Sequence, residues 1–500
     1  MSDLKTVLKD LGNVFIAVGI ISLFPLLVPL YFQEYYAIIP LILTSLIFLE
    51  IGILFYFLFR RTDPSNFKSA MVTAALCWLF IPLISIIPFI MIPYQIHTAA
   101  HMDILSAFFE SMSGWTGTGL TMVDKESFLP YTLQFWRTWT AWIGGVGVIV
   151  LSLSILAQPG VGSYVLYRGE AREQRTHPSI VASVRTIWWI FLLYTIIGFI
   201  VVFFISWLFP NGMNLWQTIN HTMTALATCG FSVTDDSIAG FGTYVQLAMV
   251  VLMCMGAIAF AAHYNLLKKR VKMFFADAQL RAMLVLIFIG VIMLILIIMN
   301  DPNLGYKQNL FHAVRDSGFQ FVSALTCTGF QTVDIRTWTE SAKLLLSLAM
   351  IIGGAAGSTA GGIKLFRAIL LGKGTNWRIK RIISTSRRVF IRKFGDRSLS
   401  NEEATDLINE AAIVSFMWIL ILVISFFVMG FIYHSETIGN IFFEVCSAQG
   451  NVGLSIGLTS ISMEPLAKIM LIFGMWIGRL EIIPVIVLIR SLLGIKRNVL

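Results

Sequence analysis

Four stretches of the chain follow one pattern: FESMSGWTGTGLTMVD (109–124), NHTMTALATCGFSVTD (220–235), QFVSALTCTGFQTVD (320–334) and FEVCSAQGNVGLSIG (443–457). They align on a shared glycine, which is Gly119, Gly230, Gly329 or Gly453. Leu or Phe follows each glycine, Gly or Ala lies five positions before it, and Ser or Thr lies six positions before it. The spacings between these glycines are 111, 99 and 124 residues. Four matches in one register indicate an internal fourfold repeat.

A short segment precedes each of the four loops. These segments cover roughly 103–114, 215–226, 311–325 and 437–448. They are too short to cross a bilayer, because a spanning helix needs about 20 residues, so we expect four re-entrant helices. The irregular backbone of the loops must line a shared cavity, since its polar groups would have no partners in lipid. Four such loops around one axis would form a pore.

The composition supports a membrane protein. The chain has 500 residues, of which 57% are hydrophobic and 13% are charged. A soluble domain is about 25% charged, which excludes a set of ordinary soluble domains. The expected fold class is an all-α polytopic membrane protein. The apolar residues are concentrated in seven long runs, at 11–32, 37–59, 70–93, 186–209, 242–262, 282–299 and 411–433.

The net charge of +9 follows the expected membrane topology and does not indicate a nucleic-acid partner. Six stretches hold 26 of the 36 Lys and Arg residues, at 1–12, 60–69, 158–182, 264–281, 366–401 and 490–500. They fall at alternating hairpin ends, so the positive-inside rule places them, and both termini, in the cytoplasm. The opposite loops are acidic. Their charge either raises the local cation concentration or reflects only the lack of Lys and Arg.

The sequence contains no recognisable enzyme or metal motif. Its five cysteines have no paired spacing, which argues against a disulfide scaffold and a zinc site. No phosphate-binding loop and no Ser/His/Asp set is found. An intramembrane enzyme is therefore a remote alternative, and we expect no bound cofactor.

Loops of Gly and Thr suit the binding of a cation. Their carbonyl oxygens can replace its hydration shell, four at each level, and each re-entrant helix directs its negative C-terminal end toward the pore. The alternative is that the small residues are packing contacts between membrane helices. The expected filter residues are the four that end at each shared glycine: Thr116, Gly117, Thr118, Gly119, Ala227, Thr228, Cys229, Gly230, Thr326, Cys327, Thr328, Gly329, Gly450, Asn451, Val452 and Gly453.

The loops, together with GGAAGSTAGGIK (353–364) and GMWIGRLEIIP (474–484), resemble the TrkH/KtrB potassium transporters over essentially the whole chain. The resemblance implies four M1-P-M2 repeats with pseudo-fourfold symmetry around a central pore, preceded by two extra transmembrane helices as in the TrkH branch. The implied divisions are an N-terminal hairpin at 1–62, repeats at 63–160, 161–270, 271–372 and 403–500, and a basic cytoplasmic linker at 373–402.

The resemblance also implies a function and partners. It implies potassium uptake across the cytoplasmic membrane of a prokaryote by a homodimer in which each subunit has its own pore. A cytoplasmic ring of TrkA-like regulatory subunits would bind the controlling nucleotide, since this chain has no dinucleotide motif. In the wider superfamily a serine at the first filter glycine accompanies sodium preference, so four glycines favour potassium. A sodium-coupled or sodium-permeable transporter is the alternative.

One quadrant of the filter is chemically different. Loop four lacks the Thr that precedes the shared glycine in loops one and three, and it has Val452 there instead. Its carbonyl oxygens can still serve as ligands. We therefore expect this loop to depart from ideal fourfold symmetry.

The second span of repeat three, at about 340–371, contains five glycines within ten residues. Such a cluster disfavours a continuous helix, and broken backbone at membrane depth must line a cavity; close helix packing is the alternative. The resemblance assigns this loop to an intramembrane gate and places Arg479 in the pore beneath the filter. A structural ion pair with Glu481 is the alternative for Arg479. The expected gate residues are Gly353, Gly354, Gly357, Ser358, Thr359, Gly361, Gly362 and Arg479.

The linker is the most basic stretch of the chain. Its charges either reflect topology and contact with anionic lipid or form a docking surface for the regulatory ring, and both can hold. The residues concerned are Arg378, Lys380, Arg381, Arg387, Arg388, Arg392 and Lys393.

Overall fold

The structure, a computed structural model, describes residues 2–94, 100–147, 180–302, 304–384, 392–394 and 397–493. The expected boundary between repeats one and two, at residues 160 and 161, lies outside these residues, as do Arg387 and Arg388 of the linker. Helices dominate the described residues, and they are accompanied by one two-stranded hairpin.

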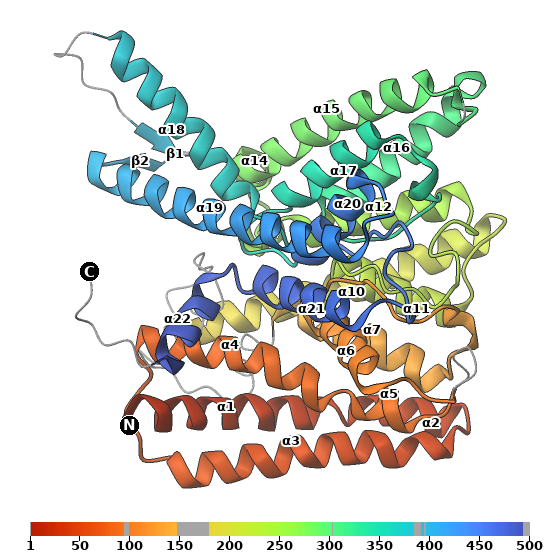
Figure 1. Cartoon of the computed structure of the whole chain (residues 1–500), viewed down its shortest axis with the longest axis vertical. Coiled ribbons are helices and arrows are strands. Elements are labelled where there is room, and N and C mark those ends of the chain that lie inside the picture. Colours follow the sequence, from red (N-terminus) through yellow and green to blue (C-terminus); the bar gives the residue numbers. More distant parts are fainter. Residues whose placement is uncertain are drawn as a thin grey trace.

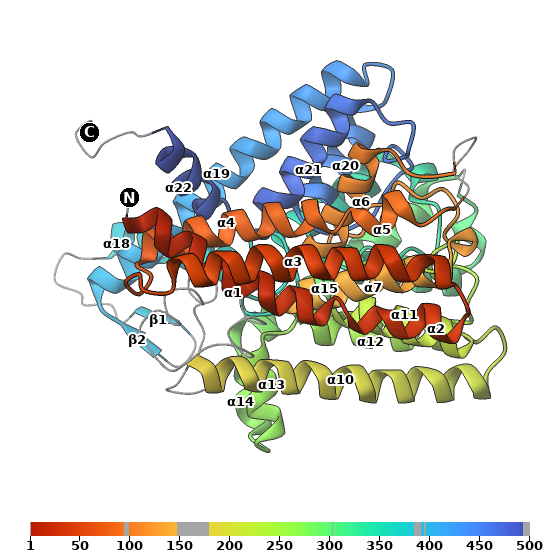
Figure 2. The ribbon, with the colours of Figure 1, turned by 90° about the horizontal axis from the view of Figure 1, so that it is seen from below.

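Two long helices form the N-terminal hairpin. Its elements are α1 (Ser2–Ile21), η1 (Phe24–Leu26), α2 (Leu27–Tyr31), η2 (Tyr35–Ala37) and α3 (Ile38–Phe59). Glycine allows the two long helices to approach closely, because a Cβ atom placed on Gly12 would lie 2.8 Å from the carbonyl oxygen of Gly52. Figures 1 and 2 show α1 and α3 side by side along one flank of the molecule.

The N-terminal hairpin holds the outer end of repeat one. The repeat comprises α4 (Phe67–Ile84), α5 (Ile87–Met91), the re-entrant α6 (Ile104–Thr116), η3 (Glu126–Phe128) and α7 (Tyr131–Val146). The Glu34 carboxylate accepts hydrogen bonds from the backbone amides of Tyr131 and Thr132, both at 2.8 Å. A carboxylate at a helix N-terminus is stabilising, so Glu34 caps α7 from outside its own repeat.

The other three repeats have the same order of elements. By the expected divisions, repeat two comprises α10 (Ile180–Leu208), the re-entrant α11 (Leu215–Leu226), α12 (Thr243–Ala257) and α13 (Phe260–Leu267). Repeat three comprises α14 (Val271–Ala276), α15 (Ala278–Asn300), η4 (Tyr306–Gln308), the re-entrant α16 (Leu310–Leu325), η5 (Ile335–Thr337), α17 (Glu340–Ile352) and the start of α18 (Leu365–Ile383), which continues into the linker. Repeat four comprises α19 (Asn401–Ile432), the re-entrant α20 (Ile438–Gln449), α21 (Pro465–Arg479) and α22 (Ile483–Leu492).

The helices confirm a polytopic helical membrane protein. Among the described residues, six helical segments are long and apolar enough to span a membrane: Asp3–Tyr31, Tyr35–Phe59, Phe67–Met91, Val181–Leu208, Ala278–Asn300 and Asn401–Ile432. Two further helix pairs pass the same test together but are sharply bent. The bends measure 105° between α12 and α13 and 112° between α21 and α22.

The sequence predicts an interrupted second helix in repeat three, whereas the structure also has sharp bends after the second helices of repeats two and four. The glycine cluster predicts a break in repeat three, where α17 and α18 flank residues 353–364. At the bend in repeat two, tertiary hydrogen bonds replace those of a continuous helix. There the carbonyl oxygens of Gly256 and Ala257 accept bonds from the amides of Thr359 and Ala355, at 3.1 and 3.0 Å. The loop of repeat three therefore satisfies carbonyl groups that the end of α12 leaves open.

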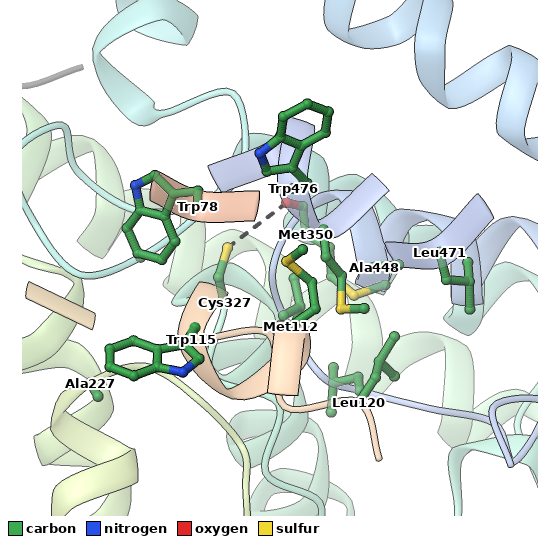
Figure 3. Close-up of a cluster of buried hydrophobic side chains, with 14 of the residues drawn as sticks. Trp78, Met112, Trp115, Leu120, Ala227, Cys327, Met350, Ala448, Leu471 and Trp476 are labelled. Atoms are coloured by element: carbon green, nitrogen blue, oxygen red, sulfur yellow. Dashed lines mark hydrogen bonds between the residues drawn. The ribbon is translucent and has the colours of Figure 1, made fainter. Parts of the chain in front are cut away.

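A buried apolar cluster packs behind the loops. Figure 3 shows Trp115 near Ala227, with Met112 and Leu120 close by and Trp78 and Trp476 on the other side of the group. The Cys327 Sγ atom in this cluster lies 3.9 Å from the carbonyl oxygen of Met350. Because close-packed side chains have little freedom to shift, a cluster drawn from all four repeats fixes the loops relative to one another.

One end of the molecule carries most of the basic linker. Figures 1 and 2 show α18, α19 and the hairpin of β1 (Arg392–Phe394) and β2 (Arg397–Leu399) at the same end as the start of α1 and the short α22. The strands are antiparallel, with Lys393 opposite Ser398. The Lys373 ammonium lies 5.1 Å from the ring centroid of Phe394, which joins the hairpin to α18.

Candidate functional site

Each re-entrant helix ends in the same kind of turn. The residue two positions before the shared glycine is left-handed in all four loops: φ is 70° at Gly117, 50° at Thr228, 54° at Cys327 and 51° at Asn451. The next residue donates its amide to a carbonyl five positions earlier, at 2.8 Å for Thr118 and 2.9 Å in the other three loops. These bonds occupy carbonyl groups at the helix C-terminus, so the turn follows from the end of the helix.

The four shared glycines form a closed ring. A Cβ atom on Gly119 would lie 2.6 Å from the amide nitrogen of Gly230, and one on Gly230 would lie 2.6 Å from the carbonyl carbon of Gly329. A Cβ atom on Gly329 would collide with loop four, and one on Gly453 would collide with loop one. The structure thus brings all four predicted filter loops together in the order one, two, three, four around an axis.

The small hydroxyl residue six positions before the glycine supports the ring in three loops. The Oγ atoms of Ser113, Ser323 and Ser447 accept bonds from the amides of the shared glycines, at 3.0, 3.1 and 3.0 Å. In loop two, Thr224 instead donates its hydroxyl to the Asn220 carbonyl oxygen at 3.1 Å. The recurrent Ser or Thr therefore has a structural cause in the geometry of the loop.

Loop two, rather than loop four, has the divergent backbone. The values of φ are 92°, 92° and 96° at the shared glycines of loops one, three and four, whereas Gly230 lies outside the left-handed region. Loop four keeps the common geometry because its Asn451 Nδ2 donates to Thr118 Oγ1 and to the Met475 carbonyl oxygen, both at 2.9 Å. The asymmetry expected at loop four is thus chemical, and the amide side chain is accommodated.

A cavity of about 540 Å³ adjoins the glycine ring on the side of the segments that follow the loops. All four shared glycines line it. Glu126 is 9% exposed there; burial raises the pKa of its carboxyl group to about 7, although the nearby Arg137 lowers it. The acidic residues of the lining are Asp124, Glu126, Asp235, Asp236 and Asp334. A cation entering this cavity meets a largely negative surface.

The glycine-rich segment 353–364 contacts the filter loops from another direction. The Thr359 Oγ1 atom lies 2.9 Å from the Gly256 carbonyl oxygen and accepts a hydrogen bond from Thr228 Oγ1 at 3.0 Å. The amide of Gly362 donates to the carbonyl oxygen of Gly450 at 3.0 Å. The segment therefore touches loops two and four directly, at residues of the predicted filter.

The predicted gate residues do not all lie at these contacts. The carbonyl oxygen of Gly357 accepts from the amide of Phe260 at 3.0 Å, and the Ser358 hydroxyl donates to Ala355 within the segment at 2.6 Å. Gly361 packs so closely on the Gly450 carbonyl oxygen that a side chain would not fit. The structure thus brings Thr359, Gly361 and Gly362 to the predicted filter loops, while Gly357 bonds to α13 of repeat two and Ser358 bonds within the segment.

Arg479 is the last residue of α21 and joins three repeats. Its Nη1 donates to the Thr359 carbonyl oxygen at 3.2 Å, and its Nη2 donates to the Gly145 carbonyl oxygen at 2.9 Å and also to that of Gly144. A Cβ atom on Gly117 would lie 3.9 Å from Nη1, so the guanidinium group is close to loop one. The Glu481 carboxylate pairs with Arg367 of α18.

Comparison with known proteins decides the family. The family model described as TrkH, cation transport protein, matches residues 41–498. The chain belongs to the TrkH family. An uncharacterized cation transporter of Methanocaldococcus jannaschii is 33% identical over 501 residues, covering 98% of this chain and 96% of the relative. The Trk system potassium uptake protein TrkH of Escherichia coli is 29% identical over 442 residues, covering 86% and 87%.

A solved structure of the TrkH family has the same fold. The crystal structure of the potassium transporter TrkH from Vibrio parahaemolyticus matches with a TM-score of 0.80 at 25% identity, over 99% of both chains. The resemblance inferred from the loops is therefore confirmed. So is the fold class, which consists of four M1-P-M2 repeats around a central pore with two extra helices before them.

Sequence reasoning missed one buried ion pair of this TrkH-family chain. The Nε atom of Arg137, on α7, donates to Glu110 Oε1, on α6, at 2.7 Å, and both side chains are fully buried. The Glu110 carboxylate also accepts from the Met122 amide at 2.7 Å. A signal was present, because each charge lies in an otherwise apolar stretch of repeat one, and an ionisable residue at membrane depth is a functional candidate.

Proposed function

We propose that this protein takes up potassium ions across the cytoplasmic membrane of a prokaryote through a gated, selective pore. The observation that carries this proposal is the ring of Gly119, Gly230, Gly329 and Gly453, where backbone from four repeats meets around one axis beside an acidic cavity. The names of the relatives as potassium uptake proteins and cation transporters support it. They also favour transport over the alternative of an intramembrane enzyme.

Selection occurs at the glycine ring in this mechanism. A hydrated potassium ion is concentrated in the acidic cavity and loses water as it enters the loops. Carbonyl oxygens of the four-residue segments that end at the shared glycines replace that water. The C-terminal ends of α6, α11, α16 and α20 add partial negative charge. These segments bear no carboxylate, so the ion is held by dipoles and can leave again.

Segment 353–364 and Arg479 act as the gate beneath the ring. The segment lies against loops two and four through Thr359 and Gly362, and Arg479 donates to the carbonyl oxygen of Thr359. The guanidinium charge opposes a cation that passes close to it, while its hydrogen bonds hold the segment in place. Opening would therefore require the bond between Arg479 and Thr359 to break.

Control comes from the end of the molecule that carries the linker. We propose that this end is cytoplasmic, that the chain forms a homodimer with one pore in each subunit, and that a TrkA-like ring binds the regulatory nucleotide. In support of this, α18 begins directly after the gate segment and continues toward β1 and β2. Movement of α18 by a docked partner would be transmitted to residues 353–364 with no intervening loop.

A growth experiment tests the proposed function. The protein, co-expressed with a TrkA-like partner, should restore growth on low potassium to a bacterium that lacks its own uptake systems. Gly329→Val should insert but fail to restore growth, because a Cβ at Gly329 collides with loop four. The matched control Gly430→Val, at a helix position with no neighbour within 4 Å, should behave as the wild type.

Absence of rescue by inserted wild-type protein would contradict the proposal. Rescue that requires external sodium would favour the sodium-coupled alternative.

A further inference from the structure

The segments that follow the four shared glycines are joined by hydrogen bonds that repeat in position but not in residue type. The acceptor is the carbonyl oxygen of the residue two positions after the glycine. Ser232 accepts from Arg137 Nη1 at 2.9 Å, Gln331 accepts from the Ile238 amide at 3.0 Å, and Ser455 accepts from Gln331 Nε2 at 2.6 Å. We call these three bonds the outer belt. They connect loop one to two, two to three, and three to four.

Arg137 supplies the first bond from an unusually constrained position. Besides Ser232, its guanidinium donates to Glu110 Oε1 at 2.7 Å and to Thr121 Oγ1 at 3.0 Å. Its Cζ atom lies 4.3 Å from the ring centroid of Phe231, which directly follows the shared glycine of loop two. Thr121 follows the glycine of loop one by two positions. One fully buried side chain thus holds the segments just beyond two adjacent filter glycines.

The other repeats have no charged residue at the corresponding position. Each second helix has a buried polar residue near its start, namely Gln134, Gln246, Lys343 or Lys468. Three residues later the chain has Arg137 in repeat one and an apolar residue in the others, namely Met249, Leu346 or Leu471. In repeat three, the corresponding bond to the next loop is donated by the side chain of Gln331, which lies in the loop segment and not on the second helix. Two different side chains therefore donate to the same backbone position in loops two and four.

We propose that the outer belt sets the cation selectivity of the pore, with Arg137 and Gln331 as positioning residues that fix the separation of neighbouring loops. This inference rests on the proposed function. The bonded carbonyl groups lie only two residues beyond the ring, so a change in loop separation alters the ring directly. Loops that are free to move can close around a smaller cation, and discrimination against sodium then falls. The bonds from Arg137 are charge-assisted, which makes them strong as well as directional.

Two variants each remove one side-chain bond of the belt without leaving a buried charge unpaired. Gln331→Leu removes the side-chain donor and keeps the size of the residue. Glu110→Gln combined with Arg137→Gln replaces the ion pair by two amides. Arg336→Gln is the control, because Arg336 lines the same cavity and pairs with Glu436 at 3.7 Å, but forms no bond of the belt. The permeability ratio of potassium to sodium is measured in vesicles that contain purified protein, alongside Gly119→Ser.

We expect the ratio to fall roughly fivefold in each belt variant, the factor that corresponds to about one hydrogen bond, and to stay at the wild-type value in Arg336→Gln. Lower yield alone would not move this ratio. If folded belt variants keep the wild-type ratio while Gly119→Ser changes it, the belt is only structural and the inference fails, although the proposed function stands. An equal fall in Arg336→Gln would attribute the effect to cavity charge and also overturn it. If neither wild-type selectivity nor an effect of Gly119→Ser is found, the proposed function fails with it.

Discussion

Gly119 combines a φ of 92° with a lack of space, since a Cβ atom there would lie 2.6 Å from the amide nitrogen of Gly230. Both conditions exclude an ordinary side chain. We predict that Gly119→Ser still inserts but loses much of its preference for potassium over sodium, because loops one and two must separate. The permeability ratio in vesicles measures this, with Gly430→Ser as the control at an uncrowded glycine. An unchanged ratio in Gly119→Ser would contradict the filter assignment.

Arg479 is expected to restrict the passage of potassium beneath the ring. Two unit charges 4 Å apart repel by about 4 kcal/mol at an effective dielectric of 20, and the guanidinium also holds Thr359 in place. Arg479→Gln should therefore raise potassium flux several-fold and weaken dependence on the regulatory partner. Arg479→Lys should be intermediate, because it keeps the charge and loses the planar fork.

The control for Arg479 is Arg315→Gln, which breaks an ion pair to Asp316 on α16, away from the gate segment. It should lower stability without changing flux per folded molecule. Flux is normalised to folded protein in both cases. If Arg479→Gln leaves normalised flux unaltered and only reduces yield, the residue is structural and is not part of a gate.

Glu126 predicts a dependence on external pH. Burial raises the pKa of this carboxyl group to about 7, so it is mainly charged at pH 8 and mainly neutral at pH 6. Acid therefore removes one negative charge from the cavity beside the ring. Uptake at subsaturating potassium should fall as external pH decreases from 8 to 6, by roughly two- to tenfold for the loss of one unit charge beside the path of the ion. Glu126→Gln should be low at both pH values. A variant that retains the full pH dependence would show that another group titrates.

At the scale of elements, the gate segment leaves and rejoins its helix at almost the same place. A Cβ atom on Gly353 would lie 2.8 Å from the Cα atom of Gly362. Deletion of residues 354–361 therefore joins two positions that are already adjacent. We predict that this deletion raises basal cation flux, because it removes the segment that lies against loops two and four. Loss of flux from a folded protein would mean that the segment is needed for conduction.

The re-entrant helices and their loops could be predicted from the sequence because the repeat fixes their register. The segment expected at 215–226 is α11 (Leu215–Leu226), and the one at 311–325 is α16 (Leu310–Leu325). The bends at α12 and α21 could not be predicted in this way. The first depends on carbonyl groups that bond to a distant segment, and the second places the non-glycine Glu481 and Ile482 at positive φ. Such bends depend on tertiary contacts, which a local sequence pattern does not reveal.

The sequence predicted only part of the candidate site, for the same reason. The aligned glycines indicated the proposed filter residues, and the structure brings the four glycines into one ring. The ion pair of Glu110 and Arg137 was missed because each repeat was compared only around its glycine, whereas the partners lie 27 residues apart on two helices of one repeat. Loop two was not identified as divergent, since its departure is in the backbone and its glycine is retained.

At the scale of the whole molecule, the repeats enclose the ring and the N-terminal hairpin supports it from outside. Glu34 caps α7, and α7 carries both Arg137 and the Gly145 carbonyl oxygen that binds Arg479. One helix thus contacts the proposed filter and the proposed gate. This arrangement links the added hairpin to the pore, and it makes α7 the element through which damage to the hairpin would affect transport.

We propose that the four glycine loops form a potassium-selective pore. The most direct test is the zero-current potential of purified protein in a lipid bilayer, with potassium on one side and sodium on the other. We predict a permeability ratio of potassium to sodium well above one, which decreases in Gly119→Ser. A ratio of one or below in folded, conducting wild-type protein would contradict it.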